Sequence, residues 1–359
     1  MVRKVGVGII GSGFVSRIHA EALKHVPDAE IVAVASKTRA HVEKFAKDFG
    51  IHKWFTDYHE LLRLDEVDVV CVGVPNYLHA RVAIDAAESG KHVIMEKPLC
   101  MNLREADEMI NACRKAGVKL MYAECLCFAP KYVRAKQLID EGAIGKLYLI
   151  KQSEKHFGPH SDWFWDVEKC GGGVLMDMGC HAFQFMRWVC DRAPVKSIYC
   201  QLGTYVHKDK TKGDDNSVAI VEFEGGIIGI AEDSWAKRGG MDDVAEFYGS
   251  DGVIYADLLK GSSLIVYSER GYGYAVEKAP TTKGWTFAMF EEIWNYGFPQ
   301  EMTHFIECVK EDKTPLVTGE DGKVVLEMIF AAYKSAKDGR KIPLPFKTDA
   351  KKPIDLWVE

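Results

Sequence analysis

Three polar side chains, Lys97, Asp177 and His181, are of the types that hydride transfer from an alcohol requires. Oxidising a secondary alcohol removes a hydride from the carbon and a proton from its hydroxyl. A base must therefore reach the oxygen, and a cation or hydrogen-bond donor must stabilise the alkoxide that forms. His181 can accept a proton near neutral pH, and Lys97 can hydrogen-bond the same oxygen. Asp177 can orient the histidine or bind a neighbouring hydroxyl, so all three residues are predicted to be catalytic.

The spacing of these residues supports this interpretation, although each also has an ordinary structural explanation. Lys97 follows the apolar run HVIM and Glu96, where a strand is expected to end. Asp177 and His181 are four residues apart in a segment expected to begin a helix, so they would share one face. The glycines at 171–173 would let the backbone come close to a ligand. Taken singly, Lys97 could be an exposed strand-end lysine, His181 a hydrogen-bonded core histidine and Asp177 a helix cap.

A glycine turn near the N-terminus predicts a dinucleotide site. The segment VGVGIIGSGFVSRIHAEAL reads as an apolar strand that passes through Gly-Ser-Gly directly into a helix. In a dinucleotide-binding fold the first glycine, here Gly11, permits the tight turn, and the second, Gly13, lets the backbone approach the pyrophosphate. Phe14 and Val15 open the helix whose N-terminus faces the phosphates. Ser16 takes the third position of the pattern, where a small residue still permits close helix packing.

The residues after the expected second strand bear on the choice of nucleotide. An acidic residue normally binds the adenosine ribose of NAD at this point. This chain has Ser36, followed by Lys37 and Arg39. A hydroxyl with two nearby cations would accept a 2′-phosphate, which favours NADP. Alternatively the two cations are a solvated helix start and an NAD ribose meets Ser36, so both NAD and NADP remain open.

The order of the elements predicts two domains. Strands and helices alternate six times up to about residue 125, which indicates an α/β Rossmann domain with a doubly wound parallel sheet over residues 1–124. Longer runs of alternating apolar and polar residues then replace this rhythm. They indicate an α+β domain with a large open mixed or antiparallel sheet over residues 125–359, for substrate binding and oligomerisation.

Composition excludes several classes of protein. The chain has 359 residues and a formal net charge of −6, which disfavours nucleic acid as a partner. It has no apolar run long enough to span a membrane, and its N-terminus lacks the features of a secretory signal, so a cytoplasmic location is expected. The ten cysteines include no Cys-x-x-Cys pair. We expect buried reduced thiols and no metal site, although Cys170, Cys180 and His181 could in principle ligate one.

The chain resembles the glucose-fructose oxidoreductase, inositol dehydrogenase and rhizopine-catabolism family over almost its whole length. The resemblance rests on five segments: GSGFVSRIHAEAL, VPNYLHA, EKPL, GGGVLMDMGCHAF and HFIECVKEDKTPLVTGEDG. It implies that Lys97 lies between nicotinamide and substrate, with Asp177 and His181 on the substrate side. It further implies cofactor-side positions for Pro75, Asn76, His79 and Glu96. The segment ECLCFAP has Cys125 and Cys127 where many members carry an arginine or histidine, which puts polar substrate contacts there in doubt.

Aromatic residues indicate a carbohydrate pocket, because sugar rings stack their C–H faces on aromatic rings. Phe157, Trp163, Phe164 and Trp165 are close in sequence to His156 and His160. The residues expected to bind substrate are Tyr122, His156, His160, Trp163, Trp165, Asp177 and His181. The segment KGWTFAMFEEIWNYGFPQE is also aromatic-rich, and could line a pocket or serve sheet packing or a subunit interface.

Three functions fit these observations. The first is an NAD(P)-dependent oxidoreductase acting on a secondary hydroxyl of a sugar, glycoside or cyclitol, in the most specific version at C3 of a glucoside. The second is a glycosidase that oxidises C3 transiently, eliminates the aglycone and reduces again, with Tyr122, Glu124 or His160 as its extra acid or base. The third is a nicotinamide-binding sensor without turnover. The sheet expected over 145–270 has a face that no expected helix covers, so a homo-oligomer is expected: a dimer, a tetramer or a larger assembly.

Overall fold

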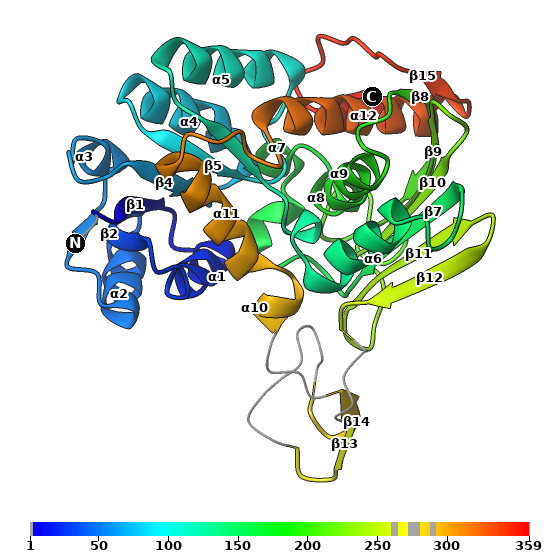
Figure 1. The fold of residues 1–359 in the computed structure, drawn as a ribbon, viewed down its shortest axis with the longest axis horizontal. Coiled ribbons are helices and arrows are strands. Elements are labelled where there is room, and N and C mark those ends of the chain that lie inside the picture. Colours follow the sequence, from blue (N-terminus) through cyan, green and yellow to red (C-terminus); the bar gives the residue numbers. More distant parts are fainter. Residues whose placement is uncertain (1–2, 260–264, 272–280, 288–291, 359) are drawn as a thin grey trace. The chain divides into compact units, whose positions relative to one another are not determined.

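The computed structural model describes residues 3–259, 265–271, 281–287 and 292–358 (Figure 1). The chain forms two compact units. The first comprises Met1–Cys125 and Phe298–Leu326, and the second comprises Leu126–Gly297 and Glu327–Glu359. Each unit has its own sheet, and the two are described separately below.

The first unit contains a six-stranded sheet in the order β3-β2-β1-β4-β5-β6, in which every neighbouring pair is parallel. Parallel strands need crossover helices, and each strand here is a short apolar run ended by a turn. The predicted Rossmann domain is confirmed. Its strands are β1 Val5–Ile10, β2 Ala29–Ala35, β3 Lys53–Phe55, β4 Val69–Val72, β5 His92–Glu96 and β6 Leu120–Ala123. Its helices up to residue 125 are α1 Phe14–Leu23, α2 Arg39–Phe49, α3 Tyr58–Leu62, α4 His79–Glu88 and α5 Leu103–Ala116, with the 3-10 turn η1 Asn76–Leu78 before α4.

A late segment of the chain also belongs to the first unit. Helix α11, Phe298–Lys310, packs against α1, and Met121 in β6 forms a bridge with Thr318. Helix α12, Gly319–Asp338, begins here and ends in the second unit. The predicted division into 1–124 and 125–359 therefore lies at the first boundary between these units. It assigns residues 298–326 to the second domain, whereas they belong to the first unit. Sequence periodicity does not show that the chain returns to the first unit, because it predicts helices but not what they pack against.

The second unit contains a seven-stranded sheet in the order β12-β11-β7-β10-β9-β8-β15. Only β7 and β10 pair in parallel, and the other pairs are antiparallel. The predicted mixed, mostly antiparallel sheet is confirmed. Its strands are β7 Leu147–Lys155, β8 Val195–Gly203, β9 Asn216–Phe223, β10 Ile228–Ser234, β11 Asp242–Gly249, β12 Gly252–Asp257 and β15 Ile342–Pro343.

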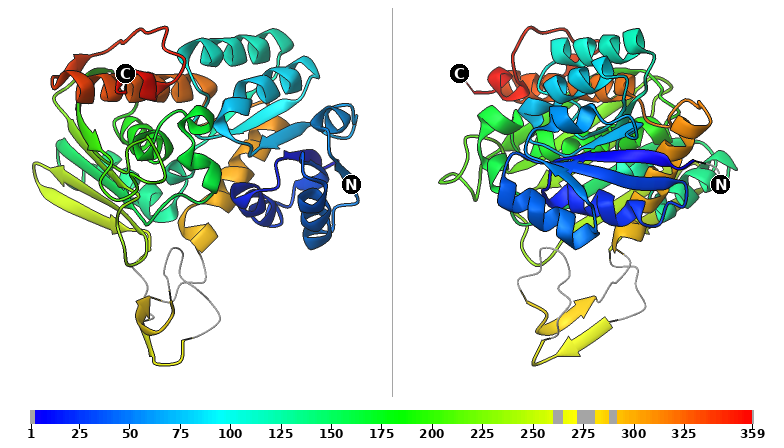
Figure 2. Two further views of the ribbon diagram at one scale, coloured as in Figure 1. Left: turned by 180° about the vertical axis from the view of Figure 1, so that it is seen from behind. Right: turned by 90° about the vertical axis from the view of Figure 1, so that its left-hand side faces the viewer.

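Helices of this unit cover one face of the sheet (Figure 2). They are α6 Pro130–Asp140, α7 Val167–Cys170, α8 Val174–Asp177 and α9 Gly179–Val189. The strands alternate accordingly: in β9, Ala219, Val221 and Phe223 are buried, while Val218 and Ile220 on the other face are each 40% exposed. Helix α9 is buried along its whole length, so it forms the centre of this unit's core.

The aromatic segment at 283–301 is only partly described. Its first residues form β14, Gly284–Phe287, which pairs with β13, Ile265–Ser268, in a two-stranded antiparallel sheet (Figure 1). Tyr267 and Trp285 are opposite one another on these strands, with ring centroids 5.2 Å apart. Residues 288–291 lie outside the described part of the chain, and the short helix α10, Glu292–Asn295, follows.

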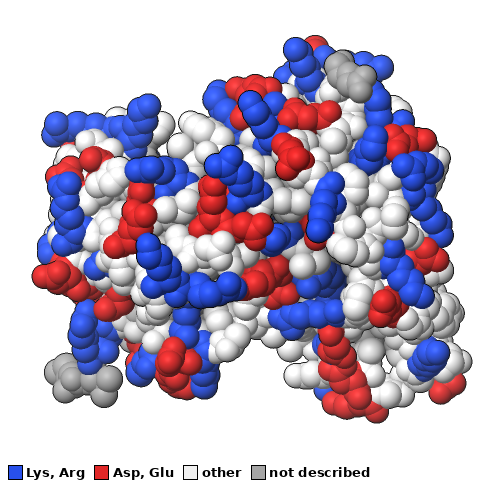
Figure 3. All heavy atoms as spheres, turned by 90° about the horizontal axis from the view of Figure 1, so that it is seen from above, with Lys and Arg blue, Asp and Glu red and all other residues white. Residues whose placement is uncertain are grey.

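All ten cysteines are buried and none forms a disulfide, as predicted. Among the described residues no helix is both long and apolar enough to cross a membrane. Lys and Arg side chains alternate with Asp and Glu over the face drawn in Figure 3. On this face the cations do not form the continuous stripe that would follow a nucleic-acid backbone.

Candidate active site

The glycine turn of the first unit joins β1 to α1. Gly11 has φ +115°, and a Cβ on it would lie 2.2 Å from the carbonyl oxygen of Gly73. Gly11 is therefore required by the fold itself. A Cβ on Gly13 would meet no atom within 4 Å. No contact within the protein therefore requires a glycine at position 13. A phosphate that approaches the backbone closely would require one.

The first turn of α1 has one exposed and one buried side. Phe14 is 43% exposed, and Val15 is half-buried. Ser16 is 1% exposed, and a Cβ on Gly73 would lie 2.6 Å from its hydroxyl oxygen. The small residue at the third position of the pattern thus allows the helix to pack closely on the turn after β4, as expected.

The residues predicted to choose between NAD and NADP are only partly available for a ligand. Ser36 accepts a hydrogen bond from Ser12, with 2.8 Å between the hydroxyl oxygens. The Arg39 guanidinium donates to Glu43 at 2.8 Å and lies 5.5 Å from the centre of the Trp54 ring. Lys37 is exposed. The pairing of Arg39 with Glu43 weakens the case for a 2′-phosphate site, since one of the two predicted cations has a carboxylate partner.

Lys97 follows β5 directly, at the carboxyl edge of the parallel sheet, and is half-buried. The neighbouring Glu96 is 6% exposed, and one of its oxygens accepts a hydrogen bond from the backbone N–H of Lys97 at 3.0 Å. Its other oxygen lies 2.9 Å from Nε2 of His19 on α1. Glu96 therefore ties the Lys97 backbone to the helix that begins at the glycine turn.

His19 was not predicted from the sequence, although a histidine on the buried face of a helix is a signal in itself. Burial would lower the pKa of His19, but Cys71 and Glu96 beside it raise that pKa well above its ordinary value. Glu301 on α11 is fully buried near this pair, and burial raises its pKa well above the usual range. The raised pKa values favour the protonated imidazole beside Glu96 and the protonated carboxyl of Glu301.

The loop predicted to run along the cofactor is fixed by its own histidine. His79 is fully buried, with Nδ1 2.9 Å from the Pro98 carbonyl oxygen and Nε2 2.8 Å from that of Val74. Burial lowers the pKa of His79. Its two nitrogens thus face the chain's own carbonyls, so the imidazole holds the loop against the EKPL segment. Pro75 is half-buried and Asn76 buried in the same loop.

Tyr122 and Glu124 lie at the carboxyl end of β6, next to Lys97's strand. Both are fully buried, and a Cβ on Gly322 would lie 3.2 Å from the Tyr122 ring. Tyr122 therefore packs on the start of α12 within the first unit. Its predicted role in substrate binding, and the role of either residue as an acid or base, remain predictions.

In the second unit, the glycine-rich segment is clamped by the chain's own residues. A Cβ on Gly172 would lie 2.3 Å from the Tyr333 hydroxyl, and one on Gly173 would lie 2.0 Å from the Asp214 carbonyl oxygen. Gly171 caps α7 at φ +91°. The expectation was that these glycines bring the backbone close to a ligand. The structure instead shows close packing against Asp214 and Tyr333, neither of which the sequence had singled out.

Asp177 and His181 follow this turn on two short helices rather than one. Asp177 ends α8, His181 lies in the first turn of α9, and Met178 separates them. The predicted single helix is therefore interrupted, although the N–H of His181 still bonds to the carbonyl oxygen of Met178 at 2.9 Å. Asp177 and His181 are 4% and 7% exposed.

Trp235 holds Asp177 in place. Its indole Nε1 donates to a carboxylate oxygen of Asp177 at 3.2 Å, and its ring is fully buried. Trp235 directly follows β10, so a strand end positions a carboxylate on a neighbouring helix. Sequence reasoning missed this residue because a lone tryptophan at the end of an apolar strand is usually only a core residue.

Two of the predicted aromatic residues, Phe164 and Trp165, pack against this tryptophan. Trp165 contacts the Trp235 ring edge-on at 5.5 Å and the His207 ring at 4.9 Å, while Trp163 stacks on Phe164 at 3.8 Å. His156 and His160 contact each other edge-on at 4.9 Å. His156, Trp235 and Asp177 are buried, whereas His160, Trp163 and Trp165 are half-buried. The structure thus brings Trp165 together with the Trp235–Asp177 pair.

We expect Trp235→Phe to lower kcat about tenfold, because it removes the N–H that orients Asp177 while keeping an aromatic ring in the core. Affinity for the nucleotide should not change, since the glycine turn lies in the other unit. Steady-state kinetics with nucleotide and substrate varied separately would check this. Trp188→Phe on α9 is the matched control, because Trp188 is also a buried tryptophan. Equal losses in both variants would mean that Trp235 contributes packing alone.

Comparisons with known proteins agree with this architecture. Residues 5–124 match the family model described as the oxidoreductase family with an NAD-binding Rossmann fold, GFO_IDH_MocA, and residues 132–255 match the GFO/IDH/MocA C-terminal domain. A myo-inositol 2-dehydrogenase of Thermotoga maritima is 30% identical over 341 residues, which cover 94% of this chain and 98% of that protein. A scyllo-inositol 2-dehydrogenase (NAD(+)) of Bacillus subtilis is 28% identical, covering 97% of this chain and 98% of that protein.

Solved structures give the same result. The crystal structure of GenD2 from gentamicin A biosynthesis in complex with NAD has a TM-score of 0.91 and 30% identity, covering 96% of this chain and 98% of that chain. A probable dehydrogenase from Thermotoga maritima has a TM-score of 0.83 and 28% identity, covering 95% and 99% of the two chains. This chain is therefore an NAD-dependent oxidoreductase of the Gfo/Idh/MocA family.

Proposed function

We propose that the protein oxidises a secondary hydroxyl of a sugar, glycoside or cyclitol by hydride transfer to NAD, with C3 of a glucoside as the specific site. The observation that carries this proposal is the carboxyl edge of the parallel sheet. There the unobstructed Gly13 turn follows β1, and Lys97 follows β5. Ligands of open α/β sheets bind outside this edge. The nucleotide supplies the hydride acceptor when it is bound.

The chain's own residues would divide the remaining chemistry between them. The Lys97 ammonium would donate a hydrogen bond to the substrate oxygen and stabilise its anionic form, and the His181 imidazole would take the hydroxyl proton. Asp177, oriented by Trp235, would hold a neighbouring hydroxyl or the histidine. The half-buried Trp163 and Trp165, together with His156, His160 and Tyr122, would contact the sugar and its substituent.

The choice of NAD over NADP rests on three observations. The family model describes an NAD-binding fold, and the GenD2 structure that resembles this chain contains NAD. The ion pair between Arg39 and Glu43 points the same way. The cofactor-side residues would be Gly11, Gly13, Phe14, Val15, Ser36, Lys37, Arg39, Pro75, Asn76, His79, Glu96 and Lys97.

The experiment is incubation of the purified protein with NAD and a panel of aryl glucosides, inositols and free sugars. Reduced nicotinamide, keto product and free aglycone should be measured together. Reduced nicotinamide in step with a keto glucoside is the expected result. Free aglycone without net reduction of nicotinamide would instead indicate the glycosidase that oxidises C3 transiently. Nucleotide binding without any product would indicate a sensor.

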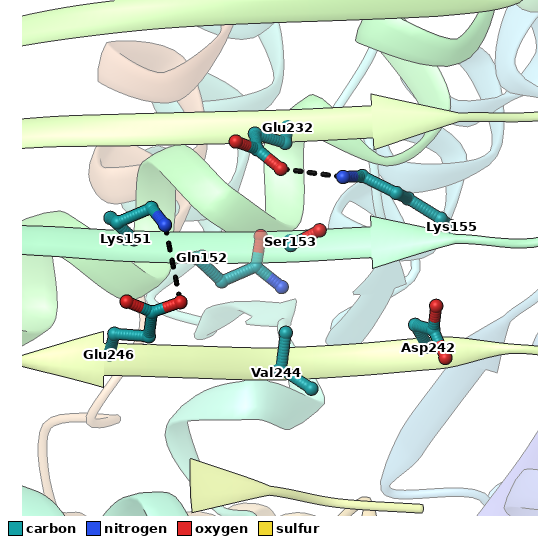
Figure 4. A pocket seen from close by; sticks show the side chains of 8 residues that line it. All are labelled: Lys151, Gln152, Ser153, Lys155, Glu232, Asp242, Val244 and Glu246. Carbon is teal, nitrogen blue, oxygen red and sulfur yellow. Dashed lines mark hydrogen bonds and ion pairs between the residues drawn. The ribbon is translucent and has the colours of Figure 1, made fainter. Parts of the chain in front are cut away.

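We also propose that a second copy of this chain packs on the uncovered face of the seven-stranded sheet. Its apolar part includes Val218, Ile220 and Ile228, which are 40%, 40% and 41% exposed. Beside it lies the depression of Figure 4, where Lys151 pairs with Glu246 at 3.2 Å and Lys155 pairs with Glu232 at 2.5 Å. A face that carries both apolar residues and both charges can complement itself about a two-fold axis.

Size measurement in solution tests this second proposal. The protein should elute as a dimer or tetramer, and the double variant Val218→Asp, Ile220→Asp should shift it toward the monomer. Lys196→Asp, an exposed change on neighbouring β8, is the control for added negative charge. A monomeric wild-type protein at micromolar concentration would contradict the proposal.

A further inference from the structure

A buried carboxylate in the second unit is surrounded by hydrogen-bond donors from the glycine turn. Asp214 is fully buried. Its Oδ1 accepts from the N–H of Gly173 at 3.1 Å, and its Oδ2 accepts from the N–H of Leu175 at 2.8 Å. The Tyr333 hydroxyl donates to Oδ1 as well and itself accepts from the Gly173 N–H at 2.9 Å. The carboxylate and the phenol together hold the backbone that begins α8.

Each of these three groups donates a hydrogen bond to Asp214. An ionised carboxylate has only acceptor sites, so it can satisfy all three donors, whereas a protonated one would place its own O–H against them. The hydrogen bonds of this turn therefore favour the ionised form, whereas burial opposes it. Two glycines, at 172 and 173, make room for the arrangement, because a side chain at either would collide with Tyr333 or Asp214.

Asp214 itself has a pKa that lies close to the neutral range. Burial raises the pKa of Asp214 to about 6, against the hydrogen bonds from Tyr333, Leu175 and Gly173. Burial raises the pKa of the Cys170 thiol to about 12, and it raises the pKa values of Tyr333, Cys200 and Asp233 well above their usual ranges. The Cys170 and Cys200 thiols and the Tyr333 phenol are therefore uncharged near neutral pH.

We propose that Asp214 and Tyr333 are positioning residues for the reaction, because they fix the glycine turn and so set the place of Asp177 at the end of α8. This inference rests on the proposed function of Asp177. Helix α8 has only one turn, from Val174 to Asp177, and the N–H of Asp177 bonds to the carbonyl oxygen of Gly173 at 3.2 Å. A shift of the turn is therefore transmitted directly to the carboxylate.

A positioning role and a purely structural role have opposite consequences for stability. Since the pKa of Asp214 is higher in the folded than in the unfolded chain, its stabilising contribution is fully present below its ordinary pKa and is lost as pH rises through about 6. At neutral pH the protein keeps a charged group that costs stability. A residue kept only for stability would not behave in this way, whereas one that orients a catalytic turn would.

The test compares Asp214→Asn, Tyr333→Phe and the wild type in urea unfolding and in kcat across pH. Asp214→Asn should lower kcat roughly tenfold while unfolding at neutral pH at the same or a higher urea concentration. Between pH 4 and 6 the wild-type unfolding constant should rise relative to that of Asp214→Asn by roughly thirtyfold. Tyr333→Phe removes a hydrogen bond that lowers the Asp214 pKa, so the acid limb of its kcat profile should move to higher pH.

Tyr132→Phe is the matched control. Tyr132 is also fully buried and donates to a buried carboxylate, Asp243, at 2.6 Å, but it lies on α6 and its partner lies in β11. Its acid limb should not move. A wild-type kcat in Asp214→Asn, or equal shifts in both tyrosine variants, would overturn the inference. Failure of Asp214→Asn to fold would contradict the predicted stability at neutral pH. Tyr333→Phe would then still test the predicted shift of the acid limb of the kcat profile. No turnover by the wild type would overturn the proposed function instead.

Discussion

Lys97→Met is expected to lower kcat by roughly two to four orders of magnitude while NAD still binds. The substitution keeps an unbranched side chain of similar length in a half-buried position and removes the charge that would stabilise the alkoxide. The backbone N–H of residue 97 would still donate to Glu96, so the turn after β5 should keep its shape. Pre-steady-state kinetics at saturating nucleotide would separate the hydride step from product release.

Lys91→Met is the control for this variant. Lys91 stands just before the same strand, at its opposite end, and its ammonium donates to the Leu64 carbonyl oxygen at 2.9 Å. It should keep wild-type turnover. Near-normal turnover by Lys97→Met would remove Lys97 from the mechanism. A loss of nucleotide binding of the same size would assign Lys97 to the cofactor rather than to the alcohol.

Gly11→Ala is expected to destabilise the first unit by about 3 kcal/mol or more, because two costs add. The residue has φ +115°, which an L side chain rarely adopts, and the new Cβ would lie 2.2 Å from a backbone oxygen of Gly73. Backbone atoms cannot move aside as a flexible side chain can. Chemical denaturation would measure the change in the free energy of unfolding.

Gly13→Ala in the same turn provides the contrast. Its Cβ would meet no protein atom within 4 Å, so the free energy of unfolding should stay within about 1 kcal/mol of the wild type. The dissociation constant for NAD should instead rise about tenfold or more, since the methyl group would occupy the space of the pyrophosphate. Unchanged NAD affinity in Gly13→Ala would contradict the assigned place of the nucleotide.

The fold was predictable because its signals are local. Each Rossmann strand is a short apolar run, and the glycine at 50 or 117 that ends a helix is visible in the printed sequence, where the structure has a left-handed cap. The later sheet was predictable from alternation, as in β9, whose buried and exposed residues alternate along the strand. Residues 298–326 were not assigned to the first unit, because their place depends on contacts with residues far away in the chain.

In the candidate site, only the residues that motifs mark were predictable from the sequence. Lys97, Asp177 and His181 were found because motifs mark them. The residues that hold them were not, since His19, Asp214, Trp235 and Tyr333 come from other elements and reach their partners only in the folded chain. An imidazole on a buried helix face was the one visible signal among them. The glycines at 171–173 were predicted to let the backbone approach a ligand, but Gly172 and Gly173 make room for Tyr333 and Asp214. Sequence shows where a side chain is missing, but it does not show what fills the space.

The most direct test of the account uses a glucoside that carries deuterium on C3. If the substrate carbon gives its hydride to nicotinamide, the label should appear on C4 of the nucleotide, in solution or recovered from the denatured protein, and kcat should show a primary isotope effect. Lys97→Met should slow the transfer of label and Lys91→Met should not. Product formation with an unlabelled nucleotide would contradict hydride transfer from this carbon.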